Sequence, residues 1–418
     1  MDTIYAESTP PGRGGISVVR LSGPDARVIA EGLAGPLPIA RHCYLRALRD
    51  GDRLIDRGLV VRFDAGSSFT GEEVVEFQLH GAPVVVRLLQ VRLDSLGARH
   101  ADAGEFTHRG FLNGRMDLTE AEGLADLLAA ETEVQHRQAI RNAGGALQDW
   151  ATDLRSKLVR AGALVAASID FADEELPDDL AVEAVALLRE VRGRIEEQLA
   201  GFPAAEQIRT GFEVAIVGPP NAGKSSLLNA IARREVALVT PIEGTTRDVL
   251  EVRVDLGGLP VTFLDTAGLR ETKDVVERMG IERAESRAAA ADLRIHLSES
   301  GTRSARLWRD GDLCLRSKAD LTEGGDISAV TGQGVREVLD TIRSLLTERV
   351  SSAGLVTRHR QASALERALA ALDVEAGLSA ELVADNIRVA STALREVVGE
   401  IGVEDYLDEV FSAFCIGK

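Results

Sequence analysis

The 418-residue sequence contains little cysteine and few aromatic residues, and its charge is mainly of one sign. Its three cysteines, Cys43, Cys314 and Cys415, are far apart and form no C-x-x-C pair. This pattern is typical of a reducing cytosol and argues against a disulfide framework or a cysteine zinc site. An aromatic fraction of 4% argues against a large base-stacking surface. The net charge of −18 excludes a basic coat over the whole protein, although not a local basic patch.

Long apolar runs are also missing from the chain. No stretch reaches the roughly 18 apolar residues that indicate a membrane-spanning helix, so we expect no membrane insertion. The first residues lack a basic segment followed by an apolar run, so no signal peptide is expected, and these features together predict a cytoplasmic protein. What the chain does have is an ordinary hydrophobic fraction of 45% and a length that suggests about three domains.

The spacing of the hydrophobic residues changes along the first half of the chain. Residues 1–115 show short mixed segments, with strand patterns at 16–21 and 74–79. Helical spacing then begins at a predicted capping box between Thr119 and Glu122. The sequence therefore predicts an α/β domain followed by helices.

A β/α pattern interrupts the helices. It contains a continuous apolar run at 214–217, as expected for a buried strand, and a hairpin pattern at 252–264 around two glycines. Helical spacing returns after this pattern. The sequence therefore predicts a discontinuous helical domain of 116–205 and 352–418, with a β/α domain of 206–351 inserted into it.

A phosphate-binding motif follows the predicted buried strand. Residues 218–225, Gly-Pro-Pro-Asn-Ala-Gly-Lys-Ser, match G-x-x-x-x-G-K-[ST] without a mismatch and precede a predicted helix. Such a loop wraps a phosphate with backbone N–H groups, and the helix N-terminus adds partial positive charge. Lys224 can then contact the β- and γ-phosphates, and the Ser225 hydroxyl can bind Mg²⁺. The context favours a nucleotide site over a chance glycine-rich turn.

Two further segments are typical of GTPase switches. The run from Gly244 to Asp248 supplies Thr246, a threonine of the kind that closes over the γ-phosphate and completes the Mg²⁺ shell. Asp265 ends an apolar strand, where it can hold Mg²⁺ through water, and the nearby Gly268 amide can sense the γ-phosphate. The three motifs in this order predict a GTPase.

The base-recognition segment departs from its usual pattern. GTPases normally recognise guanine with N-K-x-D, whereas here Ser317 takes the place of the asparagine before Lys318 and Asp320. The Ser-Ala pair at 328–329 resembles the loop that usually touches the guanine oxygen. The connection over 297–313 is short and polar for the strand–helix unit expected there. The sequence therefore predicts an impaired base site.

With these motifs the chain resembles the MnmE (TrmE) family of tRNA-modification GTPases over essentially its whole length. The resemblance also rests on 9–15, Thr-Pro-Pro-Gly-Arg-Gly-Gly, on 265–270, Asp-Thr-Ala-Gly-Leu-Arg, and on the highly specific end 411–418, Phe-Ser-Ala-Phe-Cys-Ile-Gly-Lys. It implies an α/β folate-binding domain at 1–115 that forms a homodimer. It further implies a discontinuous helical domain and an inserted Ras-like P-loop GTPase domain with a mostly parallel sheet.

The resemblance implies an activity as well as a fold. Family members use GTP hydrolysis and a folate one-carbon donor, 5-formyl- or methylene-tetrahydrofolate, to install an aminomethyl-type group at carbon 5 of the wobble uridine of certain tRNAs. They act with an FAD-binding partner, MnmG, which implies a heterotetramer around the homodimer. Mg²⁺ and K⁺ are the metal ions implied for the GTPase domain.

The resemblance implies a K⁺ site. Asn221 matches the P-loop asparagine that binds this ion, and Thr240, Ile242 and Thr245 match the loop that surrounds it. A cation beside the phosphates can replace an arginine finger electrostatically. The full set of implied nucleotide-binding residues is Asn221, Ala222, Gly223, Lys224, Ser225, Ser226, Thr240, Pro241, Ile242, Glu243, Gly244, Thr245, Thr246, Asp265, Thr266, Ala267, Gly268, Lys318, Asp320, Ser328 and Ala329.

Three catalytic residues are implied in the same way, namely Lys224, Arg270 and Glu277. Leu269 follows Gly268, so the water-orienting glutamine of Ras-like switches is absent. Glu277 matches the glutamate that orients water in the family. On spacing alone, Glu277 would be interpreted as a solvated charge.

A folate site is implied in the first domain. Arg20, Glu76 and Arg115 match folate-contacting positions, and Lys418 lies at the family's C-terminal folate contact. Arginines suit the carboxylates of a folate tail, and a glutamate suits the donors of a pterin. Cys415 is expected to be a packed thiol, because no base is apparent near it in the sequence.

Two alternatives stay open at this stage. One is a GTPase switch in ribosome or RNA assembly, whose RNA-binding part should be basic, and the net charge of −18 counts against it. The other is a degenerate family member that folds and dimerises but binds GTP weakly, as Ser317 and the short 297–313 segment suggest. The affinities for GTP and ATP distinguish the second alternative.

Overall fold

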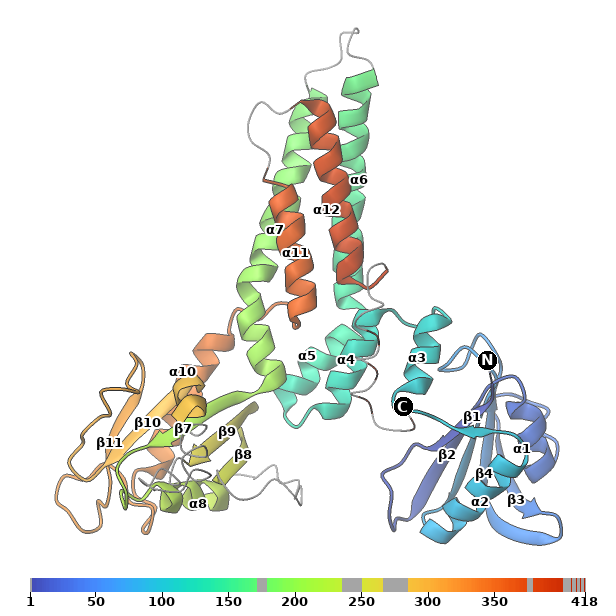
Figure 1. The fold of residues 1–418 in the computed structure, drawn as a ribbon, viewed down its shortest axis with the longest axis horizontal. Coiled ribbons are helices and arrows are strands. Elements are labelled where there is room, and N and C mark those ends of the chain that lie inside the picture. The colour runs from blue at the N-terminus through green and yellow to red at the C-terminus, as the bar shows by residue number, and fades with distance from the viewer. Residues whose placement is uncertain are drawn as a thin grey trace, which may run out of the picture. The chain divides into compact units, whose positions relative to one another are not determined.

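The computed structural model describes residues 2–170, 179–234, 250–265, 285–373 and 379–400, together with Leu407, Phe411, Phe414 and Gly417. The chain divides into two compact units, whose elements are labelled in Figure 1. Unit 1 consists of Met1–Ala125, Ala143–Thr152 and Leu394–Lys418. Unit 2 consists of Asp126–Asn142 and Asp153–Ala393.

Unit 1 is built around a six-stranded sheet with the strand order β3-β4-β5-β2-β1-β6. Neighbouring strands are antiparallel, except that β6 is parallel to β1. The strands are β1 Ile4–Glu7, β2 Ile16–Ser22, β3 Cys43–Asp50, β4 Arg53–Phe63, β5 Val74–His80 and β6 Arg99–His100. Strands β2 and β5 confirm the strand patterns predicted at 16–21 and 74–79.

The alternation along β5 separates the two faces of this sheet. Val75, Phe77 and Leu79 are buried in a core that also contains residues of α1 (Ala26–Ala34) and α2 (Pro83–Ser95). Their neighbours in the strand, such as Glu76, point to the opposite face, because successive side chains of a strand alternate. Charged residues of β2 and β5 therefore lie on the face that these two helices leave uncovered.

The helix α4 (Leu118–Ala129) begins with a capping box, but not the predicted one. The Glu120 N–H donates to Asp117 Oδ1 and the Asp117 N–H donates to Glu120 Oε2, both at 2.8 Å. The prediction of a box between Thr119 and Glu122 is wrong, because both residues lie inside α4 and are buried. Both pairs have capping-box spacing, and only the pair that starts before the helix can bind its free N–H groups.

The end of the chain packs against unit 1 near α3 (Glu105–Leu112). A Cβ atom on Gly104, which has φ +68°, would lie 2.2 Å from the carbonyl oxygen of Phe411. The Ser8 hydroxyl, just after β1, donates to the carbonyl oxygen of Gly417 at 3.1 Å. The close approach at Gly104 therefore requires glycine, and the hydrogen bond from Ser8 holds Gly417 beside the end of β1.

Unit 2 contains a five-stranded sheet with the order β11-β10-β7-β9-β8. Its strands are β7 Phe212–Val217, β8 Leu250–Leu256, β9 Leu259–Asp265, β10 Leu293–Ser298 and β11 Leu313–Arg316. They are parallel except for β8, which pairs antiparallel with β9 and so confirms the predicted hairpin. Helices α8 (Lys224–Arg234) and α10 (Val335–Val350) contribute to the core of this sheet. The predicted mostly parallel α/β fold is confirmed.

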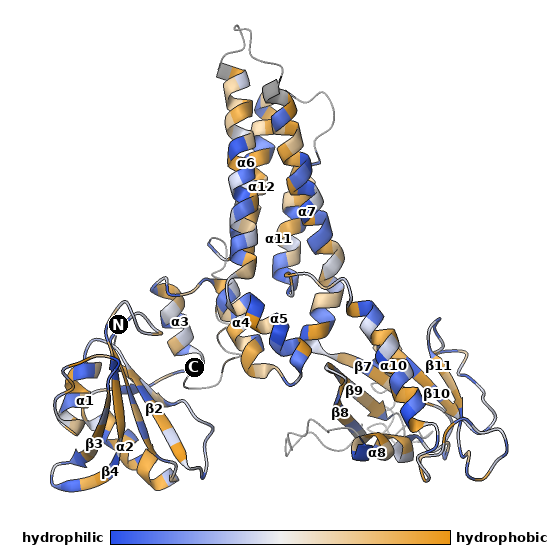
Figure 2. Cartoon of the chain, turned by 180° about the vertical axis from the view of Figure 1, so that it is seen from behind, coloured by the Kyte–Doolittle hydropathy of each residue, from blue (hydrophilic) through white to orange (hydrophobic). Residues whose placement is uncertain are grey.

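Four long helices lie side by side in Figures 1 and 2, namely α6 Ala146–Asp170, α7 Asp179–Thr210, α11 His359–Ala371 and α12 Ala380–Val397. Hydrophobic and hydrophilic residues both occur along them. Helices that precede the second sheet in the sequence thus pack with helices that follow it, as a discontinuous helical domain requires. The boundary predicted between residues 205 and 206 lies inside α7, which continues through Pro203 to its end at Thr210.

Helix α5 (Glu133–Ala143) holds the two connections between this bundle and the second sheet. The Gln135 side-chain amide donates to Arg209 O, near the end of α7, at 3.1 Å. The Asn142 amide donates to Leu355 O, in the connection from α10 to α11, at 3.1 Å. Both amides are buried and face backbone carbonyls, so one helix fixes the entry and the exit of the inserted domain.

The connection from β10 to β11 is the irregular part of the second sheet. Residues 299–312, all of them described, form turns and no helix. Leu307 of this loop packs against Val217 and Ala288, so the loop covers part of the sheet. The connection therefore lacks the helix of an ordinary strand–helix unit, which agrees with its short and polar sequence.

Candidate nucleotide-binding site

Residues 218–223 form the loop between β7 and α8, and Lys224 and Ser225 are the first residues of α8, so the motif lies between a strand and a helix as predicted. Two of its residues have left-handed backbones, with φ +60° at Asn221 and +95° at Gly223. A Cβ atom on Gly218 would lie 2.0 Å from the carbonyl oxygen of Leu297 in β10. The loop can therefore form here because glycine permits the close approach to β10 and the turn before the helix.

Lys224 lies under this loop and is 6% exposed. Its Nζ donates to the carbonyl oxygens of Gly218 at 2.9 Å and Pro219 at 3.0 Å. Burial lowers the pKa of Lys224, and the negative charge of Asp265 opposes this shift. The lysine is thus a preoriented cation at the centre of the loop, where it could meet phosphate oxygens.

The end of β9 and the start of α8 bring two oxygen ligands together. The Ser225 hydroxyl donates to Asp265 Oδ2, and Asp265 is 2% exposed. A hydroxyl and a carboxylate are the hard oxygen groups that Mg²⁺ prefers. The described residues therefore fit the predicted Mg²⁺ site.

Many of the predicted switch residues lie outside the described part of the chain. These are Thr240, Pro241, Ile242, Glu243, Gly244, Thr245, Thr246, Thr266, Ala267, Gly268, Arg270 and Glu277. Their roles in Mg²⁺ binding, K⁺ binding and catalysis therefore stay predictions.

A cavity of about 150 Å³ lies beside the P-loop, at the segment predicted to recognise the base. Its lining residues are Ala222, Gly223, Ser226, Leu227, Leu297, Ser317, Lys318, Asp320, Leu321, Ile327, Ala329 and Val330. The Ser328 hydroxyl donates to Asp320 Oδ1 at 2.5 Å and so orients this carboxylate. The structure thus brings the predicted P-loop and base residues to one cavity, with predominantly apolar walls where a purine ring would lie.

Ser317 occupies the wall of this cavity and is 4% exposed. Its N–H donates to Ser298 O at 2.9 Å, but its hydroxyl has no hydrogen-bond partner among the described residues. A buried polar group left in this way costs about 1–3 kcal/mol. The serine therefore does not provide the side-chain brace that an asparagine would.

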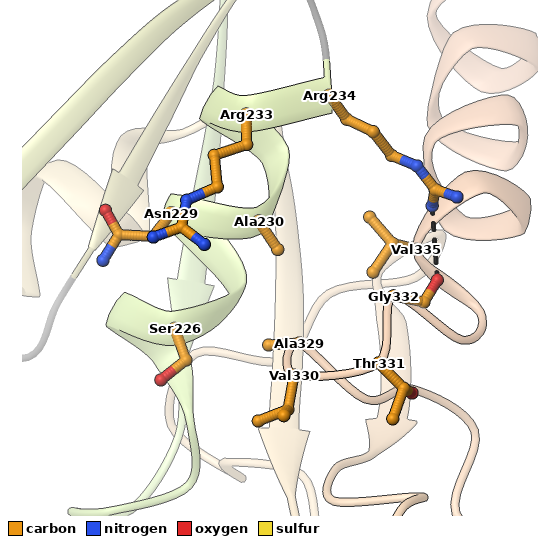
Figure 3. Close-up of a pocket in the computed structure, with 10 residues that line it drawn as sticks. All are labelled: Ser226, Asn229, Ala230, Arg233, Arg234, Ala329, Val330, Thr331, Gly332 and Val335. Atoms are coloured by element: carbon orange, nitrogen blue, oxygen red, sulfur yellow. Dashed lines mark hydrogen bonds between the residues drawn. The ribbon is translucent and has the colours of Figure 1, made fainter.

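A second hollow of about 540 Å³ adjoins the cavity between α8 and the segment that leads into α10 (Figure 3). Ser226, Ala329 and Val330 line both spaces. Arg233 and Arg234 lie at its rim, and Arg234 Nη1 donates to the carbonyl oxygen of Gly332 at 3.3 Å. The charge at this rim is positive, which suits an anion more than a cation. Sequence motifs did not indicate this hollow.

Two of the predicted folate residues meet on the first sheet. Arg20 of β2 and Glu76 of β5 are paired across the strands, and Arg20 Nε donates to Glu76 Oε1 at 3.0 Å. The Arg20 guanidinium also lies 5.3 Å from the Phe69 ring centre and 5.7 Å from that of Phe106. Charged groups and aromatic rings are thus combined at one place, which fits a ligand with a flat heterocycle and carboxylates.

The other two residues predicted to contact folate are only partly located. Arg115 Nε donates at 3.2 Å to the carbonyl oxygen of Ser68, the residue before Phe69. Lys418 and Cys415 lie outside the described residues. The carbonyl oxygen of Gly417 accepts a hydrogen bond from the Ser8 hydroxyl, just after β1. The contact brings the penultimate residue close to the strand that pairs with β2.

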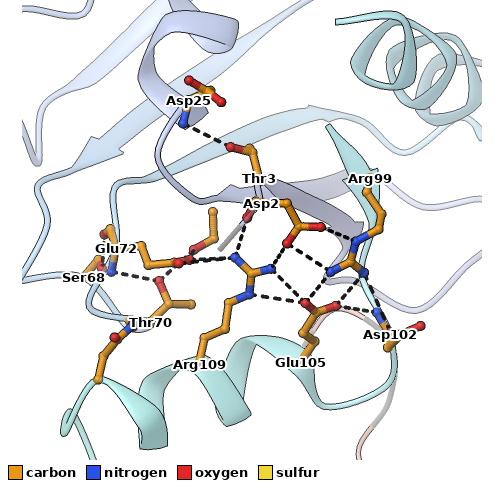
Figure 4. Close-up of polar contacts among 12 residues, drawn as sticks. Asp2, Thr3, Asp25, Ser68, Thr70, Glu72, Arg99, Asp102, Glu105 and Arg109 are labelled. Carbon is orange, nitrogen blue, oxygen red and sulfur yellow. Dashed lines mark hydrogen bonds and ion pairs between the residues drawn. The ribbon is translucent and has the colours of Figure 1, made fainter. Parts of the chain in front are cut away.

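An ion-pair network in unit 1 was not found by sequence reasoning (Figure 4). Arg109, which is 4% exposed, contacts Asp2, Glu72 and Glu105 at 2.8–3.1 Å. Arg99 contacts Asp2 and Glu105 at 2.7 Å each. Hydrogen bonds from Arg99 hold the pKa of Asp2 well below its usual range. Only Glu105 and Arg109 are four residues apart, so the other partners could not be paired from the sequence.

The described parts of the chain offer neither a cluster of metal ligands nor a membrane-spanning helix. These parts contain no group of three or more His, Cys, Asp or Glu side chains that could hold a metal ion. None of the helices described here is long and apolar enough to cross a membrane.

Comparisons with known proteins place the chain among characterised families. A family model described as MnmE helical domain matches residues 118–415, and one described as GTP-binding protein TrmE N-terminus matches residues 3–115. The chain is 60% identical over 420 residues to the tRNA modification GTPase MnmE of Paracoccus denitrificans, with 100% of both chains covered. It is 51% identical over 428 residues to the protein of the same name from Roseobacter denitrificans, again with 100% of both chains covered.

A likeness to solved structures is much weaker. A GTP-binding protein from the hyperthermophilic archaeon Sulfolobus solfataricus in complex with GDP is 15% identical. The match covers 47% of this chain and 67% of that chain, with a TM-score of 0.25. This score is too low to support a structural conclusion.

Proposed function

The chain belongs to the MnmE family of tRNA modification GTPases, so it is a GTP-hydrolysing enzyme of tRNA modification, and we propose that its target is carbon 5 of the wobble uridine. One observation carries the assignment of the nucleotide site. The sequence from the end of β7 into α8 matches the P-loop motif without a mismatch. Lys224 lies beneath the loop, and Ser225 contacts Asp265.

The phosphate end of this site would act through charge and orientation. Lys224 binds the β- and γ-phosphate oxygens and offsets their charge as it develops during hydrolysis. The P-loop N–H groups and the N-terminus of α8 surround the β-phosphate. Ser225, Thr246 and Asp265 would hold Mg²⁺, which would supply positive charge to neutralise the phosphates.

K⁺ binding and the positioning of water complete the proposed chemistry. Asn221 stands in the P-loop with a left-handed backbone, and it would hold K⁺ with Thr240, Ile242 and Thr245. The side chain of Glu277 orients the attacking water, because leucine occupies the position of the usual glutamine. Arg270, which follows the Asp-Thr-Ala-Gly-Leu run of residues 265–269, is proposed as a further catalytic residue.

We assign the first domain to folate binding and dimerisation. Arg20, Glu76, Arg115 and Lys418 would contact the folate, either 5-formyl- or methylene-tetrahydrofolate. The Arg20–Glu76 pair beside two phenylalanine rings supports this role. On the same sheet face, Leu45 is 71% exposed, and Leu59 opposite it is 38% exposed. An exposed apolar surface of this kind suits a second copy of the chain.

The remaining partners are inferred from the resemblance to the family. The homodimer would assemble with FAD-binding MnmG into a heterotetramer and act on tRNA in the cytoplasm. The proposed domains are 1–115 for folate binding, 116–205 and 352–418 for the helical domain, and 206–351 for GTP hydrolysis. The return of the chain to the helical bundle after the second sheet supports the insertion.

A weakly binding enzyme is the second candidate function. It is favoured by one observation, the buried Ser317 hydroxyl without a partner in the described part of the chain. In this case the protein would fold and hydrolyse GTP, but it would need high GTP concentrations.

The test combines GTP turnover with the composition of the tRNA wobble base. A strain that lacks this protein should lose the modified uridine, and expression of the full chain should restore it. Lys224→Ala should fail to restore it and should bind GTP poorly, whereas the exposed control Glu348→Ala should restore it fully. Unmodified tRNA after expression of the wild-type chain would contradict the proposed target, and capture of an FAD-bearing protein tests the partner.

A further inference from the structure

The loop of residues 299–312 starts with a closed turn next to the base-recognition segment. The Thr302 N–H donates to Ser298 Oγ at 2.6 Å, and this hydroxyl donates to the Thr302 carbonyl oxygen at 3.1 Å. The carbonyl oxygen of Ser298 in turn accepts the N–H of Ser317 at 2.9 Å. The backbone on both sides of Glu299 is therefore fixed relative to Ser317.

The far end of the loop is held by a buried carboxylate. Asp312, whose side chain is 1% exposed, accepts the Arg294 Nε–H at 2.8 Å and the Arg309 N–H at 2.7 Å. The Ser304 N–H donates to His296 Nδ1, which leaves the Nε2–H of this histidine to donate to Asp312 at 3.3 Å. Burial alone would raise the pKa of Asp312, but hydrogen bonds from Arg294 lower it overall. The loop is thus anchored at both ends.

Glu299 uses this fixed position to bind the lysine of the base-recognition segment. Lys318 Nζ lies 2.5 Å from Glu299 Oε1. Lys318 has a left-handed backbone with φ +60°, and it lines the base cavity together with Ser317 and Asp320. The ion pair therefore restrains a long side chain at the wall of the cavity.

We propose that Glu299 is a positioning residue for guanine binding, which substitutes for the missing asparagine brace by fixing Lys318 through their ion pair. The inference rests on the proposed GTP site and extends it. Ser317 cannot brace the segment through its hydroxyl, whereas the loop offers a carboxylate from a different part of the chain. A restrained lysine loses less rotamer freedom when the nucleotide binds, because that ordering has already occurred in the free protein.

A double-mutant cycle on the full-length chain tests the proposal. The four proteins are the wild type, Glu299→Ala, Ser317→Asn and the double variant, and the readout is the Kd of a non-hydrolysable GTP analogue by calorimetry. Glu299→Ala should raise the Kd about threefold, because exposed ion pairs contribute little individually. In the Ser317→Asn background the same change should raise it less than about 1.5-fold, since the asparagine then supplies the brace.

Controls separate positioning from folding and from long-range charge effects. Glu348→Ala, an exposed change on α10 that removes the same charge, should leave the Kd unchanged. Steady-state assays of Glu299→Ala should show a higher KM with an unchanged kcat, and its melting temperature should match the wild type. An unchanged Kd, or an equal rise in both backgrounds, would overturn the role of Glu299. Failure of the wild type to bind the analogue would instead overturn the proposed GTP site.

Discussion

The two ends of the candidate nucleotide site are built differently. The core of the phosphate end is one continuous stretch, the strand–loop–helix of β7, the P-loop and α8, to which Asp265 of β9 adds a carboxylate. The base end is assembled from separate stretches around Ser298, Ser317 and Ser328, which are connected by hydrogen bonds. A continuous element is specified by local sequence, so its motif has to be complete. An assembled element can tolerate the loss of one side-chain contact if a residue from another stretch provides a substitute contact.

The largest expected effect lies at the phosphate end. Glu277→Ala, a change outside the described residues, should leave the affinity for GTP almost unchanged and slow hydrolysis by about 10²–10³-fold, as loss of one orienting group typically does. Single-turnover kinetics at saturating GTP and K⁺ measure this directly. Hydrolysis at the wild-type rate would mean that another group positions the water.

The identity of the monovalent ion should have the next largest effect. K⁺ should accelerate hydrolysis by about tenfold or more, whereas Na⁺ should not, because a cage of oxygens sized for the larger ion holds Na⁺ poorly. If the loop of residues 240–245 orders across two GTPase domains, K⁺ should also promote their association, which sedimentation would detect. Equal rates in both salts at matched ionic strength would contradict the predicted role of Asn221.

A change at Gly218 tests how strictly the continuous end is specified. Gly218→Ala places a Cβ atom 2.0 Å from the carbonyl oxygen of Leu297, and only backbone movement can relieve the clash. Overpacking of this kind destabilises by about 1–3 kcal/mol, and GTP binding should weaken with it. Gly32→Ala is the control. It should be tolerated because a Cβ atom at Gly32 has open space around it and the backbone there does not require glycine. Wild-type stability and affinity for Gly218→Ala would show that the loop can adapt.

The smallest expected effect lies at the assembled end. Ser317→Asn should tighten GTP binding by about twofold to fivefold and leave the hydrolysis rate at saturation similar, because the amide can brace the segment and satisfy its own polar atoms. Selectivity over ATP should be retained, since Asp320 accepts N–H donors that adenine lacks at that edge. Competition binding with GTP and ATP measures both effects.

Ser317→Ala is the matched control for this change. It removes the hydroxyl that is unpaired within the described structure, so stability should rise slightly while the affinity for GTP stays the same. Weaker GTP binding by Ser317→Asn would indicate that Ser317 does not occupy the base site.

The same contrast between continuous and assembled features explains which sequence predictions succeeded. The strands at 16–21 and 74–79 and the hairpin at 252–264 were confirmed, because alternation and paired glycines are local signals. The capping box was misplaced by two residues, since Asp117–Glu120 and Thr119–Glu122 have the same spacing. Only the position of the first turn of α4 distinguishes them.

Features formed by distant residues could not be predicted. The network around Arg109 includes Asp2 and Glu72, and no spacing rule relates either of them to Arg109. The contact of Gln135 with the end of α7 likewise depends on how helices pack. Such pairings cannot be predicted locally, because a buried polar group usually bonds to whichever partner the fold brings near it.

By itself, the sequence determined the P-loop, the order of the GTPase motifs and the family, because each depends on residues that are neighbours in the chain. The tertiary structure decided which carboxylate holds Lys318, and it buried the Ser317 hydroxyl where no described residue bonds to it. Glu299 and Lys318 are 19 residues apart, and a loop anchored by Asp312 brings them together. Such contacts depend on the path of the folded chain, and local spacing contains no information about that path.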